Sequence, residues 1–365
     1  MPQDVTFFMP YQEKVATGLS AALERHLLWA RDMGFLPSEA AADRYRFSQH
    51  AELGAWFCPE PEQDRDLDLQ LDVNGWFFMV DDAFDVPAGQ TADGAVAVCV
   101  QLIELLSGSA TTAAGRATSP LVTAFADIWR REREGMSEFW RQRASCTWTG
   151  YLAGNLAEEA NRRAAAVLTT AEYMRVRRQS IGVLPAYGMG ETVGPSEVPP
   201  LAWYSNHLAA MRRLTIEHVI MVNDVHSLEK DEARHEKNLV SLLVGQRGLS
   251  RDAAIGQVVS TADDHMRKFQ ELESGIPALC DRLALTSTGR AAVHRQVASM
   301  RDMVSGNYHW SRTCGRYSRE ATVLLGAGRP SLLGLHDLTS AELGDGKCSG
   351  TSSREQVKLM VICLS

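Results

Sequence analysis

Three long stretches without proline most constrain how this chain folds. They cover residues 121–184, 201–276 and 278–329. Proline inside a helix costs roughly 3 kcal/mol, so its absence is compatible with long helices. The same stretches lack the alternating pattern of strands and the Asn-Gly or Asp-Gly turns of hairpins. The sequence therefore predicts an all-α protein.

Apolar periodicity then locates the individual helices. The predicted ranges are 11–33, 67–84, 93–107, 120–134, 137–163, 170–183, 201–229, 250–274 and 287–314. The segment 188–200, rich in glycine and proline, is a domain boundary or a loop within one bundle, and its shortness favours the loop. We expect one helical domain over 1–330 and a flexible tail over 331–365, where glycine and serine gather.

Composition limits the compartment and the partners of the chain. Of 365 residues, 45% are hydrophobic and 22% are charged, which is typical of a globular protein with a sizeable core. A formal net charge of -8 argues against a nucleic-acid partner. No apolar run could span a bilayer, and the first residues do not resemble a signal peptide. Seven scattered cysteines without a Cys-x-x-Cys pair indicate reduced thiols, so we expect a cytoplasmic protein.

Three aspartates follow a very apolar run, 76–80, and we call them the acidic motif: Asp81, Asp82 and Asp85. In a helix, residues four apart differ by about 40° in direction, so Asp81 and Asp85 share one face. The three carboxylates repel one another, and a helix C-terminus disfavours negative charge. The motif therefore indicates a metal site. A solvated acidic helix end before Pro87 is the alternative.

A second set of metal-type ligands lies later in the chain, and we call it the Asn/Ser/Asp motif: Asn223, Ser227 and Asp231. Its members are four residues apart and line one helical face. Amide, hydroxyl and carboxylate oxygens are ligands that Mg²⁺ accepts, often together with substrate phosphates. Both motifs together predict two walls of one magnesium site. A polar helix end with Glu229 and Lys230 in solvent is the alternative.

Basic and aromatic side chains complete the candidate site. Diphosphate could be bound by Arg177, Arg178, Lys230, Arg316 and Tyr317. Arginine suits bidentate phosphate contacts and lysine suits a point contact, although any one of these could be ordinary surface charge. The aromatic candidates are Phe57, Trp76, Phe77, Phe78 and Trp310. Such rings most often pack in a core, but beside a carbocation their faces would stabilise positive charge.

In combination, these motifs resemble those of bacterial class I terpene synthases, over residues 1–330. The acidic motif matches the aspartate-rich motif of the family. The Asn/Ser/Asp motif matches its second metal motif, with Asp231 where the family usually has glutamate. Arg177 matches the diphosphate-sensor arginine, and Arg316 with Tyr317 matches a C-terminal Arg-Tyr pair.

The resemblance implies a fold, a cofactor and a reaction. The fold would be a single-domain helical bundle with a central active-site cavity. Three Mg²⁺ ions would bind, two at the acidic motif and one at the Asn/Ser/Asp motif. Arg177, Lys230, Arg316 and Tyr317 would bind the diphosphate of an isoprenyl substrate. Ionisation would then create an allyl cation in a cavity closed to water.

The resemblance also suggests roles for residues that shape the cation. Ser180 and Ile181 match the linker and effector positions of the family, just before a possible helix break. Phe57, Phe77, Phe78 and Trp310 would form the aromatic wall.

The chain length resembles that of sesquiterpene cyclases, so the first expectation is cyclisation of farnesyl diphosphate. Geranylgeranyl diphosphate, for a diterpene cyclase, is the alternative. A chain-elongating prenyltransferase would normally carry a second aspartate-rich motif, and a di-iron bundle would carry paired Glu-x-x-His motifs. A non-enzymatic helical bundle is the alternative from a different class. A homodimer is expected from the resemblance alone.

Overall fold

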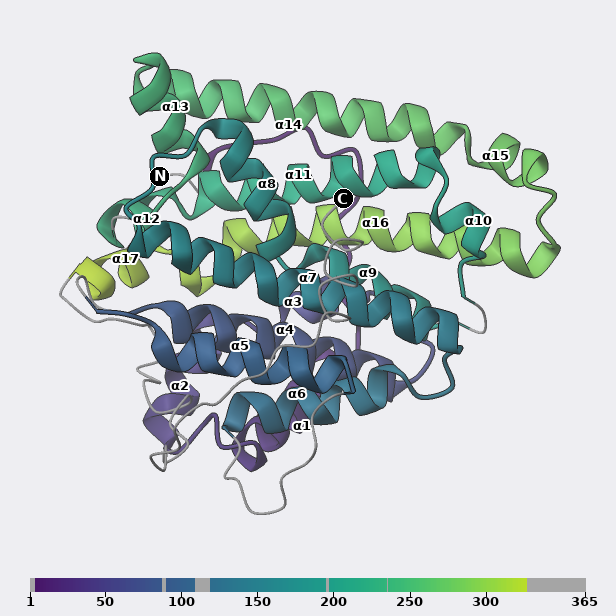
Figure 1. Cartoon of the computed structure of the whole chain (residues 1–365), viewed down its shortest axis with the longest axis horizontal. Coiled ribbons are helices and arrows are strands. Elements are labelled where there is room, and N and C mark those ends of the chain that lie inside the picture. The colour runs from purple at the N-terminus through teal and green to yellow at the C-terminus, as the bar shows by residue number, and fades with distance from the viewer. Residues whose placement is uncertain (1–3, 87–89, 109–118, 195–196, 235, 327–365) are drawn as a thin grey trace, which may run out of the picture.

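The computed structural model describes residues 4–86, 90–108, 119–194, 197–234 and 236–326 (Figure 1). Within these ranges the regular elements are helices and no residue lies in a strand, which confirms the predicted all-α fold. The tail predicted over 331–365 lies outside the described residues. Across the described ranges, no helix combines the length and the apolar character needed to cross a membrane.

The order of the helices along the chain is α1 (Leu19–Asp32), α2 (Glu39–Ser48), α3 (Leu53–Phe57), α4 (Asp64–Phe84), α5 (Asp93–Leu106), α6 (Pro120–Glu132), α7 (Glu138–Arg163), α8 (Thr170–Ser180), α9 (Val183–Thr192), α10 (Pro200–Trp203), α11 (Asn206–His226), α12 (Leu228–Arg234), α13 (Leu239–Arg247), α14 (Arg251–Ser274), α15 (Ile276–Arg282), α16 (Ser287–Thr313), the 3-10 helix η2 (Gly315–Tyr317) and α17 (Arg319–Gly326). Helices α4 to α8, α14 and α16 occupy the predicted ranges closely. Side-chain caps explain several of their starts: Ser137 accepts the Trp140 N–H at α7, and Thr169 forms a capping box with Glu172 at α8.

Three of the predicted boundaries are wrong. The single helix predicted over 201–229 is three helices, because Ser205 accepts the Leu208 N–H and starts α11 anew, and α11 ends before Ser227. The loop predicted over 188–200 starts later, because α9 continues to Thr192. The helix predicted over 11–33 begins only at Leu19.

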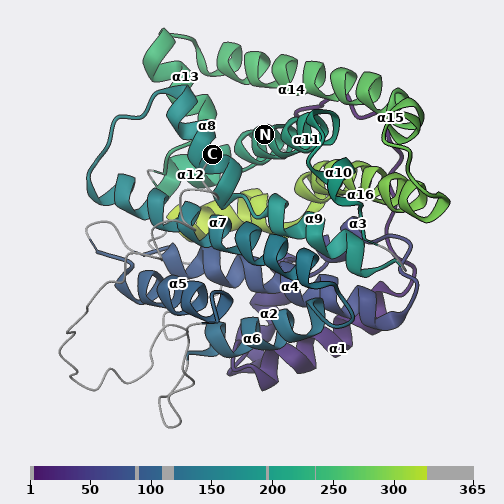
Figure 2. The same cartoon turned by 45° about the vertical axis from the view of Figure 1, so that its right-hand side comes forward.

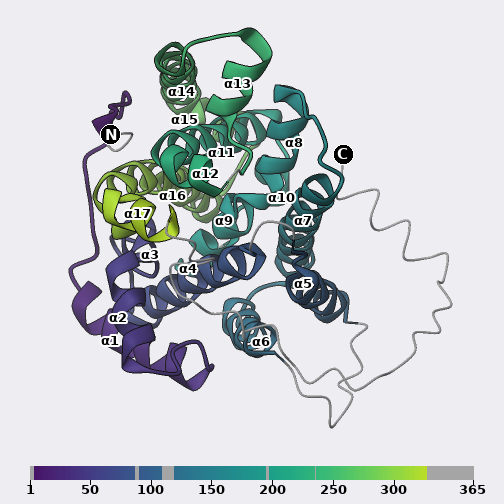
Figure 3. The same ribbon diagram turned by 90° about the vertical axis from the view of Figure 1, so that its left-hand side faces the viewer.

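The apolar side chains form two large cores. One packs α8, α9, α11, α13, α14 and α16 together, and the other packs α1, α4, α5, α6 and α7. Figure 3 shows α11, α14 and α16 above α4, with α1, α5 and α6 below or beside it. Helix α14 lies along the outer side of α11, as the turned view in Figure 2 also shows. The interior between the two cores is where α4, α7, α8, α11 and α16 face one another.

Helix α4 is the central element that carries the acidic motif into this interior. Leu71, Val73 and Trp76 are fully buried, so the helix is enclosed on several sides rather than amphipathic. Across from it, the chain breaks between α8 and α9 at Gly182, whose φ is +79°. A Cβ at that position would lie 3.2 Å from the Phe77 ring, so glycine serves both the left-handed turn and the close packing.

Candidate active site

A cavity of about 880 Å³ lies between the two cores. Its wall includes residues of α3, α4, α7, α8, α9, α11, α12, α16 and η2. The cavity is lined by fifteen of the sixteen residues expected to form the site: Phe57, Phe77, Phe78, Asp81, Asp85, Arg177, Ser180, Ile181, Asn223, Ser227, Lys230, Asp231, Trp310, Arg316 and Tyr317. Segments separated by more than 200 residues in sequence therefore meet in one cavity.

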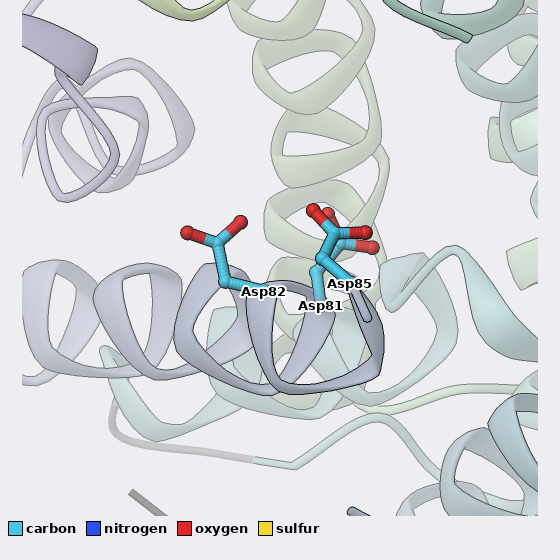
Figure 4. Close-up of side chains that lie close together, drawn as sticks. All are labelled: Asp81, Asp82 and Asp85. Carbon is cyan, nitrogen blue, oxygen red and sulfur yellow. The ribbon is translucent and has the colours of Figure 1, made fainter. Parts of the chain in front are cut away.

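The acidic motif ends α4, and its three carboxylates have different surroundings. Figure 4 shows Asp81 and Asp85 close together, with Asp82 set apart from them along the helix. One oxygen of each carboxylate nevertheless lies within 4.8 Å of the others. Asp82 is buried and does not line the cavity, and it accepts a hydrogen bond from Arg316 Nη1 at 3.2 Å. Asp81 and Asp85 are thus the members that face the cavity.

Two arginines neutralise the acidic motif. Arg316 Nη2 donates to Asp81, and Arg234 Nη1 donates to Asp85 Oδ2 at 2.5 Å. Desolvation opposes ionisation of Asp81, yet Arg316 and Lys230 hold its pKa below the usual value. Burial, together with the Coulombic effect of a nearby glutamate, raises the pKa of Asp85 well above the usual value.

The Asn/Ser/Asp motif spans the junction of α11 and α12. Ser227 Oγ donates to Asp231 Oδ2 at 2.6 Å, and Asn238 Nδ2 donates to the same oxygen at 2.7 Å. Asn223 Oδ1 accepts from Arg177 at 3.1 Å, while its Nδ2 donates to the Tyr317 hydroxyl at 2.7 Å. The side chains therefore remain on one face although the helix restarts between Asn223 and Asp231.

Both motifs suit a hard divalent cation. Every candidate ligand atom is an oxygen, from carboxylate, amide or hydroxyl groups, and Mg²⁺ prefers such ligands. The residues present therefore fit this cofactor by the chemistry of their donor atoms.

Arg177 lies near the end of α8 and contacts Glu158 of α7 and Asn223 of α11. Its Nη1 is 3.3 Å from Glu158 Oε1 and 3.4 Å from Ser180 Oγ, and Ser180 itself donates to Glu158 at 2.5 Å. The neighbouring Arg178 turns elsewhere, to Glu217 at 2.8 Å, and does not line the cavity. Of the two adjacent arginines, only Arg177 faces the candidate site.

Lys230 is buried between the motif and a carboxylate that sequence reasoning missed. Its Nζ is 3.6 Å from Asp231 Oδ1 and 3.8 Å from Glu236 Oε2. Glu236 also pairs with Arg234, at 2.8 Å. Arg234 lies three residues after Asp231 on α12, and this helical spacing could have identified it as a residue near the candidate site. Glu236 lies beyond the end of α12, so helical spacing could not have identified it.

The aromatic residues divide between cavity and core. Phe77 stacks on Trp148 with centroids 5.2 Å apart, and Phe78 packs against Trp310 at 5.4 Å. Trp76 is fully buried and donates to the Leu121 carbonyl at 2.9 Å, so it belongs to the core and not to the wall of the cavity. Apolar rings thus form a wall adjoining the charged groups.

Comparison with known proteins decides the family. Residues 72–268 match the family model described as "Terpene synthase family 2, C-terminal metal binding". The chain is 37% identical over 343 residues to R-linalool synthase of Streptomyces clavuligerus, covering 94% of this chain and all of that protein.

The chain belongs to the terpene synthase family. It is also 34% identical to pentalenene synthase of Streptomyces arenae, over 90% of this chain and 96% of that protein. Among solved structures, the linalool/nerolidol synthase of Streptomyces clavuligerus superposes with a TM-score of 0.77 at 38% identity, over 84% of this chain and all of that one. The protein is therefore an enzyme, a class I terpene synthase, and the metal-binding family model together with the acidic motif indicates that it uses a divalent metal.

Proposed function

We propose that this terpene synthase uses Mg²⁺ to ionise farnesyl diphosphate and cyclises it to a sesquiterpene, with release of diphosphate. The observation that carries the proposal is the joining of both oxygen-ligand motifs with Arg177, Lys230 and Arg316 in one cavity that aromatic rings also line. Charge separation needs such an arrangement, with cationic groups at the leaving group and no nucleophile beside the carbon chain.

We assign the metal ligands from the side chains that line the cavity. Asp81 and Asp85 would hold two ions, and the Asn/Ser/Asp motif would hold a third. Asp82 would support Arg316 from outside the cavity. When bound, the ions neutralise the negative charge that develops on the departing diphosphate.

The protein's own cationic groups complete the binding of the leaving group. Arg177 and Arg316 offer planar forks of donors, and Lys230 offers a point charge. The Tyr317 hydroxyl, already hydrogen-bonded to Asn223, would add a neutral donor. These groups bind diphosphate whatever the length of the attached chain.

The remaining wall would guide the cation. The aromatic residues that line the cavity are Phe57, Phe77, Phe78 and Trp310, and aromatic ring faces stabilise positive charge without reacting. Ser180 and Ile181 line the cavity at the break between α8 and α9, where they would respond to diphosphate bound by Arg177.

The test is incubation of the purified protein with Mg²⁺ and with C10, C15 or C20 diphosphate separately, followed by gas chromatography–mass spectrometry. A cyclic C15 product that disappears with EDTA supports the proposal. A second candidate, an acyclic alcohol from the C10 substrate, is favoured by the 37% identity to R-linalool synthase. A C20 cyclic product would instead identify a diterpene cyclase.

A cytoplasmic location and a homodimer stay predictions. Cell fractionation tests the first, and size-exclusion chromatography with light scattering tests the second.

A further inference from the structure

His50 is a buried histidine outside the cavity that contacts two residues of its wall. It lies in the turn between α2 and α3 and has no exposed surface. Its Nε2 is 2.9 Å from Arg316 Nη1. Its ring also stacks on Phe78, with centroids 4.4 Å apart and an interplanar angle of 14°. One side chain thus touches both a candidate diphosphate ligand and the aromatic wall.

The contact with Arg316 determines which tautomer the His50 imidazole adopts. A guanidinium has only donors, so His50 Nε2 must accept and the ring proton must be on Nδ1. Burial, with Arg316 and Lys230 nearby, lowers the pKa of His50 well below its usual value, which agrees with a neutral ring. Within the described residues, Nδ1 has no hydrogen-bond partner. The polar contact of His50 is therefore directed at Arg316.

Arg316 and Phe78 are also adjacent to each other. The Arg316 guanidinium carbon lies 5.0 Å from the centre of the Phe78 ring. Arg316 Nη1 is shared between His50 and Asp82, and Nη2 is directed at Asp81. His50 consequently limits both the rotation of the guanidinium and the tilt of the ring, because each packs on a different part of the same imidazole.

The backbone that carries His50 is itself held in place. Gln49 ends α2 in the left-handed region, with φ of +58°, and its carbonyl accepts the Trp310 indole N–H at 2.8 Å. Trp310 packs on Phe78 as well, so the turn, the ring and the indole form one contact group.

We propose that His50 is a positioning residue that holds the Arg316 guanidinium and the Phe78 ring in one fixed relation. Diphosphate recognition and the shape of the aromatic wall then depend on the same side chain through two separable contacts. The acceptor nitrogen serves Arg316, and the flat ring serves Phe78. This inference rests on the proposed function, because it assigns Arg316 to the diphosphate.

Two substitutions separate the contacts. His50→Gln keeps an acceptor for Arg316 but removes the ring, whereas His50→Phe keeps a ring on Phe78 but removes the acceptor. For His50→Phe we expect about tenfold weaker binding of inorganic diphosphate with Mg²⁺ by calorimetry, a similar rise in KM, and an unchanged product ratio, since one hydrogen bond to a charged group is lost. For His50→Gln we expect diphosphate binding within about threefold of wild type and a changed product ratio.

The matched control is His218→Phe, on α11. His218 is also fully buried, lies outside the cavity lining, and has no hydrogen bond to either ring nitrogen within the described residues. It should leave diphosphate affinity and product ratio as in wild type. His50→Asn is a second variant that keeps an acceptor, and His50→Leu is a second variant that lacks one, so diphosphate binding can still be compared if one variant does not fold. Because leucine also lacks the ring, His50→Leu is not used for the product ratio.

Two results would overturn the role of His50. One is folded variants without an acceptor that bind diphosphate as wild type does. The other is an equal loss of diphosphate affinity and an equal change of product ratio in the variants that keep an acceptor and in those that lack one. That result would indicate that His50 has a merely structural role. If wild type neither binds diphosphate with Mg²⁺ nor consumes any isoprenyl diphosphate, the proposed function itself fails, which is a different outcome.

Discussion

Glu132 lies behind the aromatic wall and should make the stability of the protein depend on pH. It is fully buried on α6, where its Oε2 accepts the Trp148 indole N–H at 2.8 Å. Trp148 in turn stacks on Phe77, which lines the cavity. Within the described residues, Glu132 Oε1 has no hydrogen-bond partner. Burial raises the pKa of this carboxyl from 4.5 to about 8, although the Trp148 hydrogen bond opposes the shift.

The sign of the effect follows from the raised pKa. Between pH 4.5 and 8 the folded protein keeps the Glu132 proton while the unfolded chain releases it, so stability falls as pH rises through this window. From pH 5 to pH 7.5 the loss is about 3 kcal/mol, at about 1.4 kcal/mol per pKa unit. Glu132→Gln mimics the protonated acid and does not titrate. Its stability advantage over wild type should therefore grow by about 3 kcal/mol, or roughly 4 °C in Tm for a chain of this length.

The assay is thermal unfolding of both proteins at pH 5 and pH 7.5 in metal-free buffer, under conditions where unfolding is reversible. Using the difference between the two proteins cancels the titration of every other group. Glu134→Gln is the control, because Glu134 is exposed and two residues away and should show no pH-dependent advantage. An equal Glu132→Gln advantage at both pH values would refute the reasoning.

Three further predictions concern the site. Asp81→Ala should lower kcat by at least about 100-fold and abolish the Mg²⁺-dependent rise in Tm on adding diphosphate; near-normal turnover would contradict its role as a ligand. Arg177→Lys should lower kcat by about 10- to 100-fold in steady-state assays with little change in Tm, since a fork of donors near Asn223 becomes a single ammonium. Gly182→Ala should lower the free energy of unfolding by about 1–2 kcal/mol in denaturant titrations, because the φ of +79° lies in the left-handed region that alanine disfavours. The added Cβ would also contact the Phe77 ring and should change the product mixture. Unchanged stability would argue that the left-handed turn does not require glycine.

Sequence was sufficient to propose the parts of the site whose members lie a few residues apart in the chain. The acidic motif ends a helix whose period is clear, and the Asn/Ser/Asp motif keeps its four-residue spacing across the junction at Ser227. The motifs also match a known family in order and spacing, which placed Arg177 and Arg316 in the same site. Local period and motif spacing are both properties that a single sequence contains.

The other features of the site depend on contacts between segments that are distant in the chain, and these contacts cannot be predicted from the pattern of a single sequence. His50 reaches Arg316 across 266 positions, and its turn joins two short helices that periodicity did not detect. Glu158 is one of many charged residues on α7, and only the packing of α7 on α8 brings it to Arg177. Likewise, only the structure shows that Asp82 is buried against Arg316 and does not line the cavity.

Charge compensation explains why an acidic cluster can persist at a helix C-terminus, where the macrodipole disfavours it. Arg316 approaches the acidic motif from η2, and Arg234 approaches it from α12, so each carboxylate that faces the cavity has a guanidinium partner. The Arg234–Asp85 pair is buried, so removing Arg234 would leave an uncompensated carboxylate in the interior, whereas the Asp81 side chain is 54% exposed and its pair with Arg316 is partly screened by solvent. The donor geometry of both arginines is also what a diphosphate requires. Under the proposed function, a diphosphate that took these donors would free the oxygens of Asp81 and Asp85 for cations, so the same arginines would compensate the carboxylates without substrate and contact the leaving group with it.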